Sequence, residues 1–323
     1  MVNDLISIFT RMASYKFVGE SNPCDLCNSM ERRTVGTRDR YGHKLHTVMC
    51  TNCGLVFLDP MPTEEEVNLY YTRFYRKHYH NVVTPRKKDV VSAFHGARLR
   101  HELIAPLIKK GVKALDVGAG GGEFITHLCR EGVDAVGIEP NKGYAEYARE
   151  TYEVPILNTT WARADIEPAS IGFVSANHVV EHFRSPFHAL SRFREWLEPG
   201  GHLFLSVPNV INPKRTPYSR FHFAHLYYFT PVTLRMMAYK VGFQETDICT
   251  NDDTTVVLQK IARPRTDWFY APNHAREVNN FFRTYTNKRY FLTLYPYIRW
   301  FRRMGRLIKV RMLGLLTIHP GIK

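Results

Sequence analysis

The clearest indication of the fold is the segment Leu115-Asp116-Val117-Gly118-Ala119-Gly120-Gly121-Gly122. It continues an apolar run that starts at Ala114, and a segment with helical periodicity follows it. This order indicates a glycine-rich turn that leads from a buried strand into a helix. Backbone amides at the N-terminus of such a helix face polar or anionic ligands. The stretch therefore predicts a cofactor-binding loop.

The spacing of the glycines selects the class of ligand. A dinucleotide fingerprint, Gly-x-Gly-x-x-Gly, would need a glycine where Glu123 stands, and a carboxylate there would repel a pyrophosphate. The pattern is instead Asp-x-Gly-x-Gly-x-Gly, formed by Asp116, Gly118, Gly120 and Gly122. Glu139 ends the next apolar run, where its carboxylate is placed to accept hydrogen bonds from both hydroxyls of a ribose. The spacing therefore disfavours NAD.

Strand-like and helix-like segments alternate on both sides of this loop. The apolar runs lie at 114–117, 135–138, 156–157, 172–176, 202–207 and 256–259. The helical patterns between them lie at 98–110, 142–152, 187–196 and 231–242. Such alternation indicates a parallel sheet covered on both faces. The predicted fold class is α/β, a Rossmann-like sheet with helices on both faces over residues 97–262.

Three further segments flank this core. Residues 1–62 hold paired cysteines, and residues 263–323 form a basic tail that we expect to be helical and amphipathic. Residues 63–96 are predicted to be a helical linker or lid, opened by a capping box in which Thr63 is the N-cap and Glu66 reaches back. This lid is rich in tyrosine, with Tyr70, Tyr71, Tyr75 and Tyr79.

The paired cysteines predict a zinc ribbon. Cys24 and Cys27 form one Cys-x-x-Cys pair, Cys50 and Cys53 form a second, and 22 residues separate the pairs. This spacing is typical of two knuckles that bring four thiolates to one tetrahedral ion. The alternatives are ordinary buried or redox cysteines, or replacement of one sulfur by the intervening His43 or His46. Four sulfurs leave no open coordination position, so we expect structural Zn²⁺.

Composition bounds the class of protein. The 323 residues are 44% hydrophobic and 13% aromatic, enough to bury a full-sized core and to exclude a disordered chain. No run of 18 uncharged apolar residues occurs, and the first residues lack the features of a secretory leader. Cysteine pairs of this kind suit metal ligands in a reducing compartment. We therefore expect a cytoplasmic protein.

The positive charge is concentrated in the tail. Val278 to Lys323 contain ten basic and no acidic residues, so the tail supplies +10 of the net +14 and leaves +4 for the remainder. A nucleic-acid partner is therefore disfavoured, because the body lacks a basic stripe of its own. From Tyr297 to Arg311, cations and apolar residues alternate with helical spacing. This pattern predicts peripheral binding to an anionic membrane surface, with packing on the core or across a dimer as the alternative.

These motifs together resemble those of the class I S-adenosylmethionine-dependent methyltransferases. The first two motifs of that family match Leu115 to Gly122 and Gly137-Ile138-Glu139-Pro140. Leu197-Glu198-Pro199-Gly200-Gly201 and the apolar run after it are similar to the family's turn and fifth strand. The resemblance implies that the cofactor is S-adenosyl-L-methionine. It further implies that Asp116, Gly118, Gly120 and Gly122 hold its methionine end, Glu139 its ribose, and Thr160 and Trp161 its adenine.

The string His178-Val179-Val180-Glu181-His182 has three interpretations. It matches the inverted metalloprotease motif, but no third ligand sequence is evident. Quinone-type O-methyltransferases, which the chain also resembles, use a Glu followed by a Glu-His pair for a divalent cation, and His178 departs from that pattern. Imidazole suits zinc or iron better than magnesium. The favoured interpretation is a helix start in which His178 lies at the wall of the cofactor pocket.

The acceptor is expected beyond the carboxyl ends of the strands. The connector 218–230 carries six aromatic residues in addition to His222 and His225, more than a turn requires. Its segment from His225 resembles one in zinc-ribbon sugar methyltransferases, in which a Glu-His pair serves the chemistry. Ala224 replaces that Glu, which favours O-methylation over C-methylation. The candidate catalytic residues are His225, His222 and Tyr227, with a histidine as general base.

The sequence therefore predicts an enzyme, an S-adenosylmethionine-dependent methyltransferase with an N-terminal zinc ribbon. We expect its acceptor to be a hydroxyl of a small or lipid-linked glycan or a related metabolite. An RNA or protein methyltransferase is one alternative, and a catalytically silent zinc-ribbon module that binds nucleic acid is another. Asp116, the loop glycines and Glu139 argue against the silent module.

Overall fold

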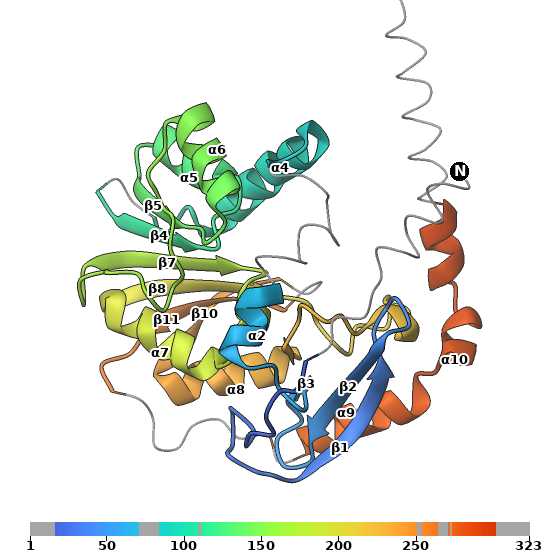
Figure 1. Cartoon of the computed structure of the whole chain (residues 1–323). Coiled ribbons are helices and arrows are strands. Elements are labelled where there is room, and N and C mark those ends of the chain that lie inside the picture. Colours follow the sequence, from blue (N-terminus) through green and yellow to red (C-terminus); the bar gives the residue numbers. More distant parts are fainter. Residues whose placement is uncertain are drawn as a thin grey trace, which may run out of the picture.

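Two β-sheets organise the part of the chain that the computed structural model describes, which comprises residues 17–70, 84–108, 111–250, 254–263, 271 and 273–301 (Figure 1). The larger sheet has seven strands in the order β10-β11-β8-β7-β4-β5-β6, and the smaller has four in the order β1-β2-β3-β9. The larger sheet forms the α/β core, and the smaller one belongs mainly to the N-terminal segment.

The central sheet is mostly parallel. Its strands are β4 (Lys113–Val117), β5 (Asp134–Ile138), β6 (Ile156–Leu157), β7 (Ile171–Asn177), β8 (Leu197–Val207), β10 (Phe243–Thr250) and β11 (Thr254–Lys260). Only β11 runs antiparallel to its neighbours β8 and β10. From β4 the chain first builds β5 and β6 on one side, then returns to place β7 and β8 on the other. The carboxyl ends of β4 and β7 therefore form the switch point at which such sheets bind ligands.

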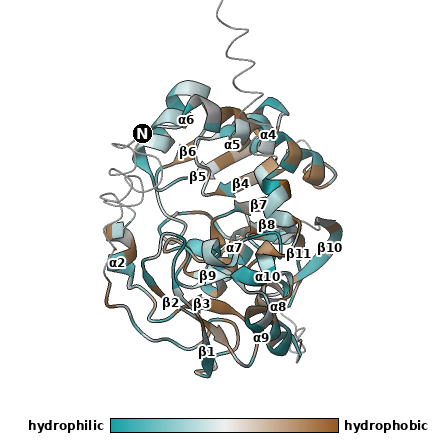
Figure 2. Ribbon diagram, turned by 90° about the vertical axis from the view of Figure 1, so that its right-hand side faces the viewer, coloured by the Kyte–Doolittle hydropathy of each residue, from teal (hydrophilic) through white to brown (hydrophobic). Residues whose placement is uncertain are grey.

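Helices cover both faces of this sheet (Figure 1). α4 (Lys87–Ile104), α5 (Glu123–Arg130) and α6 (Lys142–Tyr152) lie on one face, and α7 (Pro186–Trp196) and α8 (Pro231–Val241) on the other. Because side chains alternate along a strand, Ala114 packs in the cluster under the first three helices while Leu115 packs in the cluster under α7 and α8. Hydrophobic residues line the strands between the two layers (Figure 2).

The N-terminal segment forms the smaller sheet together with one strand from the core. β1 (Arg32–Arg38), β2 (Lys44–Cys50) and β3 (Val56–Leu58) pair antiparallel. β9 (Tyr227–Tyr228), from the connector after β8, pairs with β3, and the amide of Leu58 donates to the carbonyl of Leu226 at 2.9 Å. The ribbon is therefore continuous with the predicted acceptor segment, a connection that the sequence did not indicate.

Helices α9 (His274–Thr284) and α10 (Asn287–Phe291) follow the core. α9 packs against the ribbon: a Cβ on Gly54, which has a φ of +81°, would lie 3.2 Å from the Cα of Ala275. Arg33 of β1 also donates to the Oδ1 atom of Asn279 at 3.0 Å. Gly54 is thus required both by the turn and by the close approach of the helix.

Most predicted elements are present. The helix expected at 98–110 starts earlier, at Lys87, and α2 (Glu64–Leu69) has the predicted capping box of Thr63 and Glu66. The segment after His178 is not an α-helix but a single 3-10 turn, η2 (Val180–His182), and a second such turn is η3 (Pro217–Ser219). Three lid tyrosines, Tyr71, Tyr75 and Tyr79, and residues 302–311 of the predicted tail helix lie outside the described residues.

Replacing Thr230 by valine should destabilise the core. The hydroxyl of this buried residue caps α8 by accepting from the amide of Thr233 at 3.0 Å, and it lies 2.8 Å from Nε2 of His274. Losing the cap and leaving buried polar partners unsatisfied should lower the free energy of unfolding by about 2–4 kcal/mol. Urea denaturation measures this. The control Thr284→Val, at an exposed position of α9, should change it by less than about 0.5 kcal/mol.

Candidate functional site

The glycine loop lies at the carboxyl end of β4. Its residues Gly118, Gly120 and Gly122 all have positive φ, at 77°, 57° and 84°. The amides of Gly118 and Ala119 donate to the carbonyl of Ile138, at 2.8 and 3.0 Å, which ties the loop to the end of β5. A Cβ on Gly118 would collide with the side chain of Val179. The loop therefore needs glycine here both for its backbone conformation and for the approach of the segment that precedes η2.

Asp116 lies under this loop in a buried ion pair. Its Oδ1 atom is 3.1 Å from Nη1 of Arg100 on α4, and the same nitrogen donates to the hydroxyl of Ser175 at 3.0 Å. The Arg100 guanidinium lies 3.8 Å from the ring centre of Phe124. Burial raises the pKa of Asp116, and the guanidinium opposes that rise. The guanidinium of Arg100 therefore compensates the buried charge of Asp116 beneath the glycine loop.

Arg100 was missed by sequence reasoning. The expected helix was placed by its apolar periodicity, and a single arginine in such a helix is ordinarily a solvated residue. The sequence signal that could have identified Arg100 is a cationic residue on the apolar face of the helix that precedes the strand of the glycine loop.

Glu139 is held at the loop by two backbone amides. Its Oε2 atom accepts from Gly120 at 3.0 Å and its Oε1 atom from Asn141 at 2.8 Å. An ionised carboxylate has about four acceptor positions and can accept from several donors at once. The carboxylate is thus oriented beside the glycine loop in the place predicted for a ribose, and its contact with a ribose stays a prediction.

The two residues predicted to lie along the adenine differ in their surroundings. The carbonyl of Thr160 accepts from the amides of Arg163 and Ala164, which forms a turn. The Trp161 ring packs 5.2 Å from that of Phe183 and 5.7 Å from that of His188. Trp161 therefore forms an aromatic cluster with Phe183 and His188, which follow η2 in the chain.

A cluster of one carboxylate and several histidines lies next to the loop. Ligand atoms of Glu181, His182 and His225 lie within 4.8 Å of one another. His178, with a positive φ of 55°, donates its amide to the carbonyl of Ser206 on β8 and places Nδ1 3.7 Å from Oε1 of Glu181. Val179 links this cluster to Gly118. The cluster therefore forms the neighbouring wall of the cofactor loop.

Glu181 is the most constrained member of the cluster. Its side chain is 1% exposed, and within the described residues neither carboxylate oxygen has a hydrogen-bond partner. Its Oε1 atom lies 3.7 Å from Nδ1 of His178 and 3.9 Å from Nε2 of His182. Burying a carboxylate in this way is costly unless a nearby group becomes positively charged. The arrangement can therefore stabilise a proton, or a divalent cation, held by the histidines.

The predicted catalytic residues do not all face this cluster. The ring of His225 lies 4.9 Å from that of His182 and 5.6 Å from that of His222. His222 is buried, and its Nδ1 accepts from the amide of Ala224 at 3.0 Å. The Tyr227 hydroxyl donates instead to the carbonyl of Arg184 at 3.2 Å. His225 is thus the best placed of the three, and the catalytic roles of all three stay predictions.

Two further residues complete the surroundings of His225. Tyr228 lies with its ring 5.9 Å from His225, and its hydroxyl donates to the carbonyl of His222 at 2.7 Å. Nδ1 of His182 lies 2.7 Å from the carbonyl of Ala224, so Nδ1 must carry the proton and Nε2 can accept one. Glu181 places a carboxylate close to His225. In the similar sugar methyltransferases the carboxylate belongs to a Glu at the position of Ala224. The sequence did not indicate this pairing, because Glu181 and His225 lie in separate segments.

The stability of the protein should fall as the pH falls below about 6.5. Burial, followed by the charges of His182 and His222, lowers the pKa of His225 well below its ordinary value, so the folded state keeps this ring neutral. Below the unfolded pKa of about 6.5 the unfolded chain binds a proton that the folded chain excludes, which costs up to about 1.4 kcal/mol per pH unit. His225→Gln should flatten the slope of unfolding free energy against pH, measured by urea denaturation. An equal slope in His225→Gln and in the exposed-site control His95→Gln would contradict this assignment.

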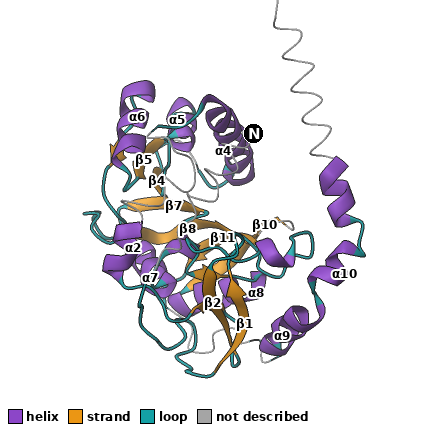
Figure 3. Ribbon diagram, turned by 45° about the vertical axis from the view of Figure 1, so that its right-hand side comes forward, coloured by secondary structure: helices purple, strands orange, loops and turns teal. Residues whose placement is uncertain are grey.

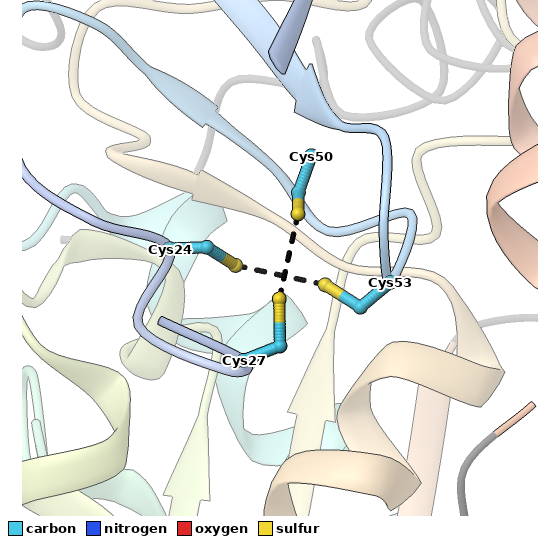
Figure 4. Close-up of side chains that lie close together, drawn as sticks. All are labelled: Cys24, Cys27, Cys50 and Cys53. Atoms are coloured by element: carbon cyan, nitrogen blue, oxygen red, sulfur yellow. Dashed lines mark hydrogen bonds between the residues drawn. The ribbon is translucent and has the colours of Figure 1, made fainter. Parts of the chain in front are cut away.

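The four predicted metal ligands meet at one point in the ribbon (Figure 4). The Sγ atoms of Cys24 and Cys53 are 3.6 Å apart, and those of Cys27 and Cys50 are 3.5 Å apart. Ligand–metal bonds of about 2.3 Å in a tetrahedron separate sulfur atoms by about 3.8 Å. The cluster therefore has the size and donor set of a closed four-thiolate site. His46 lies elsewhere, with Nε2 2.8 Å from the Thr34 hydroxyl.

Parts of this chain are similar to known proteins. A family model described as a methyltransferase domain matches residues 91–247. The ubiquinone biosynthesis O-methyltransferase of Vibrio cholerae is 31% identical over 105 residues, which are 31% of this chain and 43% of that protein. The protein of the same name from Cereibacter sphaeroides is 33% identical over 139 residues, 41% of this chain and 55% of that protein. The chain thus spans about half the length of the curated relatives it matches.

An S-adenosylmethionine-dependent methyltransferase from Mesorhizobium loti aligns with 52% of this chain and 100% of its own, with a TM-score of 0.44 and 16% identity.

Proposed function

We propose that this chain, whose residues 91–247 belong to the class I S-adenosylmethionine-dependent methyltransferases, methylates a hydroxyl of a small or lipid-linked glycan or a related metabolite. One observation carries the proposal: the loop at Gly118 packs against Val179, which leads directly into Glu181 and His182. A loop for the methyl donor and a set of proton acceptors therefore share one edge of the sheet, at its switch point.

The residues divide the reaction between binding and proton transfer. Asp116, Glu139 and the loop glycines would hold S-adenosylmethionine, which supplies an electrophilic methyl group on sulfur. Transfer of that methyl group to the acceptor oxygen would release the hydroxyl proton, and Nε2 of His182 or the ring of His225 would accept it. Glu181 stabilises the resulting imidazolium. Such a proton transfer is typically worth about 100-fold to 10,000-fold in rate.

The acceptor class is supported by the aromatic residues around the connector. Phe223 packs 4.6 Å from the ring of Tyr70, at the start of the predicted lid, and 5.2 Å from that of Phe17. Aromatic faces of this kind suit the apolar faces of sugar rings or a phenol. The names of the relatives specify O-methylation, which favours oxygen as the acceptor atom in this chain as well.

We further propose that the four-thiolate site holds Zn²⁺ with a structural role. Tetrahedral thiolate sets select zinc, and a site with four protein ligands leaves no position for substrate. The ion would fasten the turn before β1 to the turn after β2. Metal analysis of protein purified without chelators should give close to one zinc per chain.

An acceptor screen tests the function. The full chain is incubated with S-adenosylmethionine labelled in its methyl group and with nucleotide sugars, lipid-linked glycans, hydroxylated phenols, RNA or protein. We expect the label to appear in a methyl ether of a hydroxylated small molecule. The Glu139→Ala variant should not form this labelled product. Label in RNA or protein alone would contradict the proposed acceptor class, and absence of S-adenosylhomocysteine in all reactions would contradict the activity.

A further inference from the structure

The C-terminal arm, residues 287–301, exposes an unusual amount of apolar surface. Among the described residues, seven of the fifteen exposed large hydrophobic side chains lie between positions 291 and 301. Leu292, Leu294 and Phe301 are 79%, 74% and 67% exposed. The others are Phe291, Tyr297, Ile298 and Trp300. Scattered apolar residues are common on surfaces, but a contiguous group of this size marks an interaction site.

The arm is attached to the body at its start. Tyr290 is 1% exposed, and Oδ1 of Asn287 accepts from the amide of Tyr218 at 3.3 Å. Beyond this anchor the Tyr297 hydroxyl donates to the carbonyl of Phe291 at 3.1 Å, which joins α10 to the helical stretch 295–301. Figures 1 and 3 show α9, α10 and that stretch running along one side of the molecule, apart from the central sheet. The apolar residues are therefore presented on a fixed element.

The charge around these side chains has one sign. Lys288, Arg289 and Arg299 are exposed on the arm, and Arg283 is exposed on α9 just before it. The sequence contains no acidic residue after Glu277. A helix that simply packs against protein ordinarily mixes both signs on its wet face. The arm therefore combines exposed cations with exposed aliphatic and aromatic side chains.

We propose that this arm binds the surface of an anionic membrane. Tryptophan and tyrosine favour the boundary between headgroups and acyl chains, aliphatic side chains insert beneath it, and cations pair with acidic headgroups. Single-stranded RNA would use the cations and the aromatic rings, but it offers nothing to Leu292, Leu294 or Ile298. Among the described residues no helix has the length and apolarity to span a bilayer. Binding at the surface is the mode that the arm supports.

Vesicle binding of the full chain tests this proposal. Protein is sedimented with vesicles of phosphatidylcholine alone or mixed with phosphatidylglycerol. We expect it to pellet only with the anionic vesicles, and the Leu292→Glu/Trp300→Glu variant to lose at least about tenfold in partitioning. Neutralising the cations by Lys288→Gln, Arg289→Gln and Arg299→Gln should reduce partitioning about fivefold for each positive charge removed. The matched control Lys113→Glu/Lys142→Glu, with exposed lysines on the methyltransferase domain, should retain most of the binding.

Quenching of tryptophan fluorescence by lipid tests whether the arm itself contacts the membrane. Brominated phospholipids should quench the emission of wild-type protein, and Trp300→Phe should lose most of that quenching while it still pellets. Equal partitioning of wild type and Leu292→Glu/Trp300→Glu would overturn the proposal. It would also be overturned if the same variant separated a dimer of the wild-type chain, or if wild type bound RNA and not vesicles. These readouts do not depend on methyl transfer.

Discussion

Replacing Cys50 by serine is expected to remove the metal and to abolish methyl transfer. The reason lies in the shared sheet: β3 of the ribbon pairs with β9, which begins two residues after His225. Cys50 and Cys53 pack in the same hydrophobic cluster as Leu205 and Leu234 of the core. Because zinc binding supplies on the order of 10 kcal/mol to folding in small ribbons, its loss should release both the ribbon and the connector.

Metal content, the cooperativity of thermal unfolding and turnover should therefore all fall in Cys50→Ser. Cys129→Ser is the matched control, because that half-buried thiol lies on α5, where its Sγ donates to the carbonyl of Ala135 at 3.8 Å. The control should keep its metal and change the free energy of unfolding by less than about 1 kcal/mol. A Cys50→Ser protein with full turnover would show that the connector is held without the ribbon.

Replacing Glu181 by glutamine should lower the activity of the protein without lowering its stability. The amide keeps the shape of the side chain but lacks the charge that would stabilise an imidazolium on His182 or His225. We expect kcat to fall about 100-fold to 10,000-fold. The free energy of unfolding should stay the same or rise, because the folded protein no longer buries a carboxylate that lacks a hydrogen-bond partner among the described residues.

Steady-state kinetics and urea denaturation measure the two effects. Binding of S-adenosylmethionine should change by less than about threefold, since Glu181 is not part of the glycine loop. Glu167→Gln, at an exposed position, is the matched control for loss of one carboxylate. Turnover within threefold of wild type in Glu181→Gln would remove the carboxylate from the account of proton transfer.

The core was predictable because its determinants are local in sequence. The loop from Leu115 to Gly122 requires its glycines for the conformation of a single turn. The caps at Thr63 and Thr230 act within three residues, and the predicted cap at Thr63 is present. The spacing of the cysteines likewise predicts the ribbon, because two Cys-x-x-Cys pairs are typical of a four-thiolate metal site.

The arrangement of the site was not predictable in the same way. β9 has two residues and forms only because β3 offers it an edge, so its presence depends on a partner far away in sequence. Without that strand, nothing indicates that Tyr227 and Tyr228 point to opposite faces. The contacts of Arg100 with Asp116, and of Glu181 with His225, likewise arise from packing between elements.

The central claim is that S-adenosylmethionine binds at the glycine loop, and calorimetric titration tests it most directly. Wild-type protein should give saturable heat with S-adenosylmethionine, and S-adenosylhomocysteine should compete. Gly118→Val should lose that binding, because its side chain would collide with Val179. The control Gly132→Ala, at a positive φ of 80° with open space around it, should retain it. No heat with wild type, or equal affinity in Gly118→Val, would contradict the account.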